Sequence, residues 1–167
     1  MTTNYYVFID KFIAPCNVET AYTYIKQIEE YPRWWGKVYK KIIKLKDAPP
    51  DTAGSKYKIT VGGFLPYTLT IENEVTHIDK PNLIRFDALG DLKGKGTWSF
   101  RPVEDGTEIT FDWRVAANKK VIRWFSFFLK PLFRANHHYC VVKAREGMEK
   151  DLQVKQMRPT SAAVPYK

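Results

Sequence analysis

The chain has 167 residues, of which 44% are hydrophobic and 15% aromatic, and it carries a formal net charge of +9. This length suits one domain with its own hydrophobic core, and the content of large apolar residues is too high for a disordered chain. No stretch approaches the ~18 apolar residues that a membrane-spanning helix needs, and the first residues lack the pattern of a secretion signal. The two cysteines form neither a disulfide framework nor a spaced metal site, so we predict a cytoplasmic protein.

The positive charge is concentrated in three segments. Residues 37–46 and 119–134 each hold five Lys or Arg and no acidic residue, and three more basic residues follow Gln153. Such segments attract anionic ligands, phospholipid surfaces or nucleic acids. They are explained equally well as solvated outer faces and a loose tail, so the charge alone does not identify a partner.

Alternation of apolar and polar residues predicts six or seven antiparallel strands. The expected strands cover residues 4–13, 37–46, 55–61, 67–78, 83–89, 92–101 and 107–116. Lysines lie on both faces of the segment 37–46, which is typical of an edge strand. Every second residue of the last strand, from Ile109 to Val115, is apolar, so one of its faces is buried and the other is wet.

Helices are predicted after the first strand and at the end of the chain. Asn17 is a suitable N-cap for a first helix that ends near Gln27, and a short helical turn follows. Residues 120–129 favour a short aromatic helix, and Pro131 at a first helical position opens a second that runs to about Leu152. At 1.5 Å per residue this last helix is roughly 33 Å long, enough to cross the sheet. We expect one domain over residues 1–153 and a disordered tail over 154–167.

These dimensions predict a pocket between the sheet and the terminal helix. A sheet of seven strands is about 30 Å wide, whereas one helix covers only ~10 Å of it. In the strand 92–101, Gly94 and Gly96 share the face of Leu92, Trp98 and Phe100. If this is the inner face, the two glycines leave volume unfilled, unless they serve strand coiling or a close approach of the helix.

One stripe of the terminal helix combines small, apolar and polar side chains. At 100° per residue it contains Phe133, Asn136, His137, Cys140, Ala144, Gly147 and Met148. Asn136 and His137 are polar groups that point inward, so they need hydrogen-bond partners in the backbone, in water or in a ligand.

Five segments also carry a resemblance to known proteins: IAPCNVETAYTYIKQIEEYPRWWGKV, FLPYTL, LKGKGTWSF, FDWRV and LKPLFRANHHY. Over about residues 4–152 the chain resembles the START-like, or Bet v 1-like (SRPBCC), helix-grip superfamily, and within it the polyketide cyclase/dehydrase and lipid-transport group. The resemblance implies an α+β fold, with a curved antiparallel sheet of about seven strands wrapped around a long C-terminal helix. It also implies a cavity for lipids, polyketides, quinones or isoprenoid-like molecules. It does not imply one activity, because this fold hosts carriers, cyclases and receptors.

We therefore expect a protein that binds or transports a hydrophobic small molecule between sheet and helix. Asn136 and His137 would hold a polar group of the ligand. The expected ligand-binding residues are Trp35, Tyr67, Trp98, Phe111, Trp113, Phe133, Asn136, His137 and Cys140. A nucleophilic role for Cys140, one helical turn after His137, is disfavoured because a buried cysteine in an apolar stripe is usually inert. No cofactor or metal is expected, since His137 and the adjacent His138 project in different directions.

Two alternatives stay open beside the carrier. The same cavity could belong to a polyketide cyclase, aromatase or dehydratase with His137 as the acid/base catalyst, although we favour binding. The aromatic and basic residues of 119–134 would close the cavity as a lid, or would touch an anionic membrane transiently; the lid is favoured. Nucleic-acid binding is not expected, because the aromatic residues fall where a core is required.

Overall fold

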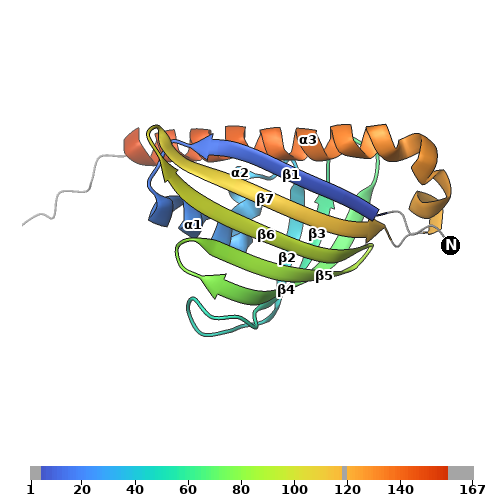
Figure 1. Ribbon diagram of the computed structural model, residues 1–167, viewed down its shortest axis with the longest axis horizontal. Coiled ribbons are helices and arrows are strands. Elements are labelled where there is room, and N and C mark those ends of the chain that lie inside the picture. Colours follow the sequence, from blue (N-terminus) through green and yellow to red (C-terminus); the bar gives the residue numbers. More distant parts are fainter. Residues whose placement is uncertain (1–4, 118–119, 158–167) are drawn as a thin grey trace, which may run out of the picture.

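A computed structural model describes residues 5–117 and 120–157 of the chain (Figure 1). The elements, in order, are β1 (Tyr5–Ala14), α1 (Val18–Lys26), the 3-10 helix η1 (Ile28–Glu30), α2 (Tyr31–Trp34), β2 (Tyr39–Lys46), β3 (Lys56–Gly62), β4 (Thr68–Asp79), β5 (Leu83–Gly90), β6 (Leu92–Val103), β7 (Gly106–Ala117) and α3 (Lys120–Met157). The order confirms the predicted α+β helix-grip fold.

All seven strands belong to one antiparallel sheet with the order β1-β7-β6-β5-β4-β3-β2. Five hairpins in succession bring β2 to β7 together, and β1 joins the sheet through β7. The lysine-rich β2 lies at one edge, as its sequence predicts, because charged side chains discourage further strand pairing. Apolar side chains of β7 are buried at every second position, which makes one face of the sheet the wall of the core.

The helices cover the inner face of this sheet. The side chain of Asn17 accepts a hydrogen bond from the Thr20 backbone N–H at 2.9 Å, which confirms it as the N-cap of α1. In Figure 1, α3 runs along the length of the sheet beside β1, and α1 and α2 lie behind the strands. The backbones of α2 and α3 approach closely, because a Cβ atom at Gly147 would lie 1.9 Å from the carbonyl oxygen of Trp34.

The terminal helix departs from the prediction in two respects. Two helices separated at Pro131 were the expectation, but α3 is continuous and contains Pro131 in its interior. A proline inside a helix removes one hydrogen bond and kinks the axis without necessarily ending the helix, and Figure 1 shows the first turns of α3 angled away from the rest. The helix also ends at Met157 instead of about Leu152. Residues 153–157 have no helix breaker, and the next proline is Pro159.

The two glycines of β6 lie on the inner face, but they do not leave open volume. A Cβ atom at Gly96 would lie 2.2 Å from the ring of Phe86, so this ring already occupies the space. A Cβ atom at Gly94 would lie 2.0 Å from the backbone carbonyl oxygen of Arg114 on β7. The expectation of empty space at these positions is therefore wrong, and close packing against the glycines is the explanation.

Candidate ligand-binding site

A cavity of about 140 Å³ lies between the inner face of the sheet and α3. Most of its walls are aromatic or aliphatic, and side chains from β1, β3, β4, β7 and α3 contribute to them. An apolar cavity of about 150 Å³ in another protein is large enough for benzene. This cavity therefore accepts one ring, or one part of a larger molecule.

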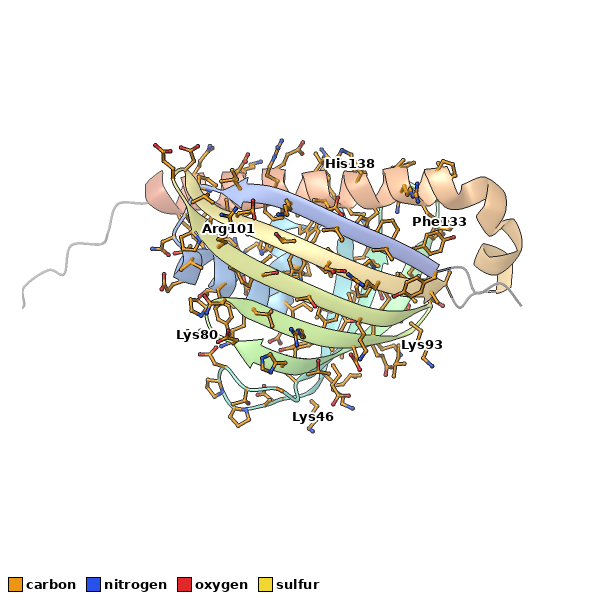
Figure 2. The ribbon with its side chains drawn as sticks, viewed as in Figure 1. Lys46, Lys80, Lys93, Arg101, Phe133 and His138 are labelled. Carbon is orange, nitrogen blue, oxygen red and sulfur yellow. The ribbon has the colours of Figure 1, made fainter. Side chains whose placement is uncertain are left out.

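Eight of the nine expected site residues line this cavity: Trp35, Tyr67, Phe111, Trp113, Phe133, Asn136, His137 and Cys140. The ninth, Trp98, lies behind Phe111, with the two rings stacked at 3.9 Å between centroids, and it lines a neighbouring cavity instead. Figure 2 shows Phe133 on the side of α3 that faces the sheet. It also shows His138 on the opposite side of the helix, where the side chain is exposed.

His137 forms a close pair with an acidic residue that sequence analysis missed. Its Nε2 atom lies 2.7 Å from Oδ2 of Asp10 on β1, and both side chains are mostly buried, at 15% and 21% exposure. The imidazole also stacks on Phe8, at 4.1 Å between ring centroids, so both its position and its orientation are held. Among the described residues no hydrogen bond involves the other ring nitrogen, Nδ1, so this atom is available to a ligand.

Asp10 is the one charged residue on the inner face of β1. Tyr6, Phe8, Phe12 and Ala14 share one face of β1 with Asp10, and this face is the inner one. An acidic residue on an otherwise apolar face requires a partner, because burial of an unpaired carboxylate is costly. The opposite face of β1 is largely apolar as well, yet its residues Tyr5, Val7, Ile9 and Ile13 are exposed, so the period of the strand alone could identify neither Asp10 as an inward residue nor His137 as its partner.

Asn136 connects α3 to the loop between β3 and β4. Its Oδ1 atom accepts hydrogen bonds from the backbone N–H groups of Phe64, at 3.0 Å, and Leu65, at 3.4 Å. Gly63 lies against the same side chain, since a Cβ atom there would be 2.1 Å from Oδ1. Backbone, water and a ligand were the possible partners of Asn136, and its Oδ1 atom is bonded to backbone N–H groups. Asn136 therefore holds the β3–β4 loop, which forms one wall of the cavity, against α3.

Two polar atoms at the cavity have no hydrogen-bond partner within the part of the chain that the structure describes. They are the hydroxyl of Tyr6 and the Oδ1 atom of Asn73, both fully buried. Burial raises the pKa of Tyr6, so this hydroxyl keeps its proton and remains a donor. A buried polar group without a partner is destabilising, and a bound ligand can supply the missing hydrogen bond. Neither residue was predicted, although Asn73 is the one polar residue in the inward series from Leu69 to Val75.

Cys140 is part of the cavity wall, but its thiol is a poor nucleophile. Burial raises the pKa of its thiol to about 12, so the nucleophilic thiolate is scarce at neutral pH. Its backbone carbonyl accepts a hydrogen bond from Nε1 of Trp35 at 2.9 Å, which fixes the indole at the cavity wall. Cys140 therefore contributes shape rather than reactivity.

The described residues contain neither a cluster of metal-ligating side chains nor a helix that could span a membrane. Among residues 5–117 and 120–157, no three His, Cys, Asp or Glu side chains gather as a metal site would require. None of the helices in that part of the chain has the length and apolar character needed to span a bilayer. The predicted membrane contact involves residues 119–134. Most of their side chains lie outside the part that the structure describes, because description of side chains resumes only at Pro131.

A second cavity, of about 400 Å³, adjoins the first on the side of α1, η1 and the loop between β2 and β3. Its rim carries charged side chains, among them Asp51 in the loop. The Asp51 carboxylate accepts hydrogen bonds from Lys26, from Lys80 at 2.9 Å and from the Tyr22 hydroxyl at 3.0 Å. Hydrogen bonds from Lys26 and Lys80 hold the pKa of Asp51 well below its usual range. The loop is therefore tied to α1 and to the β4–β5 turn.

Comparisons with known proteins agree with this architecture. Residues 10–149 match the family described as polyketide cyclase / dehydrase and lipid transport. A comparison of the sequence with curated proteins finds no match.

Among solved structures, the protein TTHA0849 from Thermus thermophilus superposes with a TM-score of 0.72 at 17% identity, over 90% of this chain and 99% of that one. The Zhui aromatase/cyclase from Streptomyces sp. R1128 gives a TM-score of 0.71 at 8% identity, over 93% and 98%. Ms6760 from Mycobacterium smegmatis gives 0.64 at 11% identity, over 89% and 92%. At these identities the similarity establishes the fold, and the family match establishes membership: the chain belongs to the polyketide cyclase / dehydrase and lipid transport family of the START-like superfamily.

Proposed function

We propose that this protein binds a hydrophobic small molecule, of the lipid, polyketide, quinone or isoprenoid kind, between the sheet and α3. The observation that carries the proposal is an apolar cavity with the Tyr6 hydroxyl buried in its wall. This hydroxyl has no hydrogen-bond partner among the residues that the structure describes. Apolar walls supply most of the affinity for such a molecule, and one or two polar groups orient it. The Tyr6 hydroxyl can donate to a carbonyl or hydroxyl oxygen of the ligand.

Native mass spectrometry of the protein purified from its own cells tests this proposal, together with titration by the apolar fluorophore 1-anilinonaphthalene-8-sulfonate. We expect a bound apolar molecule, and fluorophore binding that Val141→Phe abolishes, because Val141 is buried at the cavity wall. Ala135→Phe is the matched control, since Ala135 is exposed on the same helix. The proposal fails if no molecule co-purifies and Val141→Phe binds the fluorophore as the wild type does.

A second candidate function is catalysis by the Asp10–His137 pair. A carboxylate 2.7 Å from one imidazole nitrogen holds the ring in one orientation, as an acid/base catalyst requires. Nδ1 of His137 would take a proton from a carbon between two carbonyl groups. The resulting carbanion would attack a ketone carbon of the same substrate molecule, and the imidazolium would return the proton to the alkoxide that forms. The product is a cyclised chain and an unchanged enzyme.

Turnover of a poly-β-ketone chain separates this candidate from simple binding. His137→Gln should abolish cyclisation and leave fluorophore affinity within about twofold. Asp10→Asn acts through His137 as a positioning change, so it should lower the rate of cyclisation and leave fluorophore affinity unchanged. Cyclisation that is equally fast in the wild type and in His137→Gln would eliminate this candidate and leave the binding proposal untouched.

A further inference from the structure

The two cavities of this protein share part of their walls. Tyr39, Asn73 and Phe86 line both the cavity of about 140 Å³ and the cavity of about 400 Å³. The boundary between the cavities therefore consists of these three side chains, which we call the partition.

Two members of the partition are held in place by neighbouring rings. Phe86 lies in the notch over Gly96, with its ring 5.4 Å from that of Trp113. Tyr39 packs against Trp35 at 4.7 Å between ring centroids. The notch matters because a Cβ atom at position 96 would overlap the Phe86 ring, so any residue other than glycine there would displace this member of the partition.

Asn73 is the polar member of the partition, and its Oδ1 atom is buried without a partner among the described residues. Its neighbours on the inner face of β4, Ile71 and Val75, are apolar. A side-chain amide both donates and accepts hydrogen bonds, and a hydroxyl group does the same. A ligand hydroxyl at the partition can therefore satisfy the amide in either of its two orientations.

The second cavity is apolar beside the partition and polar at its outer rim. Val75, Ile84 and Trp98 belong to the strands β4, β5 and β6. Lys44 lies near the end of β2, and Asp51 lies in the β2–β3 loop. An apolar chain that extends from the first cavity would thus remain in apolar surroundings as it passes Asn73.

We propose that a single elongated ligand occupies both cavities and crosses the partition, with a hydroxyl group bonded to the Asn73 amide. The inference rests on the proposed binding function and narrows its ligand class. The ligand is apolar on both sides of a hydroxyl, with a ring-sized group in the smaller cavity and a longer chain in the larger one.

A series of phenylalkanes, from ethylbenzene to 1-phenyldecane, tests this geometry by calorimetric titration of the wild-type protein. If the chain enters the second cavity, each added methylene should lower Kd by up to about fourfold until that cavity is full. Counterparts with one hydroxyl placed at successive chain carbons should show a single best position. There the hydroxyl should improve Kd by about fivefold over the parent phenylalkane.

Two variants assign these effects to residues. Asn73→Leu should remove the preference for the hydroxyl while the phenylalkanes still bind. Val75→Phe should remove the gain with chain length while ethylbenzene still binds, because Val75 lines only the second cavity. Thr76→Phe, at the exposed neighbouring position of β4, is the matched control and should behave as the wild type. Unfolding curves of all three variants verify that each is folded.

The possible failures are distinguishable. If ethylbenzene binds and longer chains bind no more tightly, the cavities act separately, so the inference is wrong and the proposed function stands. If Asn73→Leu keeps the full hydroxyl preference, the role of Asn73 is wrong. If no probe binds at any length, both the inference and the proposed function are wrong. The wild-type series alone decides the first and third outcomes, even if a variant does not fold.

Discussion

Replacement of Gly63 by alanine tests the contact between the β3–β4 loop and α3. The new Cβ atom would lie 2.1 Å from Oδ1 of Asn136, so that flexible side chain must rotate away. The rotation removes the hydrogen bonds that Oδ1 accepts from the N–H groups of Phe64, at 3.0 Å, and Leu65, at 3.4 Å. The cost of the substitution should therefore equal the value of these two bonds.

The expected magnitudes follow from ordinary hydrogen-bond energies. The shorter bond contributes about 1 kcal/mol and the longer one about half as much. Gly63 has no left-handed φ angle, so alanine returns about 0.5 kcal/mol by restricting the unfolded chain. The net loss is about 1 kcal/mol for Gly63→Ala. Asn136→Ala should also cost about 1 kcal/mol, because it loses the same bonds and gains about 0.5 kcal/mol of helix propensity.

A double-mutant cycle makes the prediction specific. In the Asn136→Ala background there is no side chain to displace, so Gly63→Ala should stabilise the protein by about 0.5 kcal/mol. Urea denaturation of the wild type, both single variants and the double variant measures the free energies of unfolding. Equal destabilisation by Gly63→Ala in both backgrounds would refute the reasoning, since the cost would then arise elsewhere.

Three further outcomes are expected. Asp51→Asn should lower the free energy of unfolding by about 1 kcal/mol at pH 7, because the carboxylate loses its charge-assisted bond from Lys26. The pKa of Asp51 is lowered in the folded state, so its contribution is fully present above about pH 4 and is lost only as the pH falls through that lowered pKa; the wild type and the variant should draw together over this range. Cys140 should react with iodoacetamide at pH 8 at least about a thousandfold more slowly than a free thiol, because its pKa of about 12 leaves little thiolate. Gly147→Ala should destabilise the protein by about 2 kcal/mol, since the new Cβ atom would lie 1.9 Å from the backbone oxygen of Trp34 and α2 must move.

Each of these outcomes has its own control. Asp47→Asn removes an exposed carboxylate from the same loop, so its effect on stability should be small at every pH. The slow reaction of Cys140 should become fast in denaturant, where burial no longer raises the pKa of the thiol. Stabilisation by Gly147→Ala, as at an exposed helical glycine, would show that the helices are not in close contact.

The strands, the N-cap of α1 and the edge position of β2 could all be predicted from the sequence. These features depend on short-range patterns: a period of two, a capping residue, and lysines on both faces of a strand. The sheet-facing stripe of α3 was predictable for the same reason, and it placed Asn136, His137 and Cys140 at the cavity. The continuity of α3 through Pro131 was not predictable, because proline either bends or ends a helix according to what packs around it.

In the candidate site, too, the residues could be predicted from local patterns, but the contacts between them could not. Trp98 has the inward alternation of a wall residue, but the stacked ring of Phe111 separates it from the first cavity, and no strand pattern contains that information. Likewise, the sequence places a histidine on an apolar stripe of a helix without naming its partner.

Local periodicity in the sequence determined which side chains share a face of each helix or strand. The tertiary structure alone decided which of them meet: Asp10 and His137 are 127 positions apart, and they become neighbours only because β1 pairs with β7 at the edge that α3 covers. The partition between the two cavities arises in the same way, from residues of three different strands. The physical reason is that the grouping of side chains on one face is a property of a single helix or strand, whereas contact between side chains depends on the order and register of all of the elements.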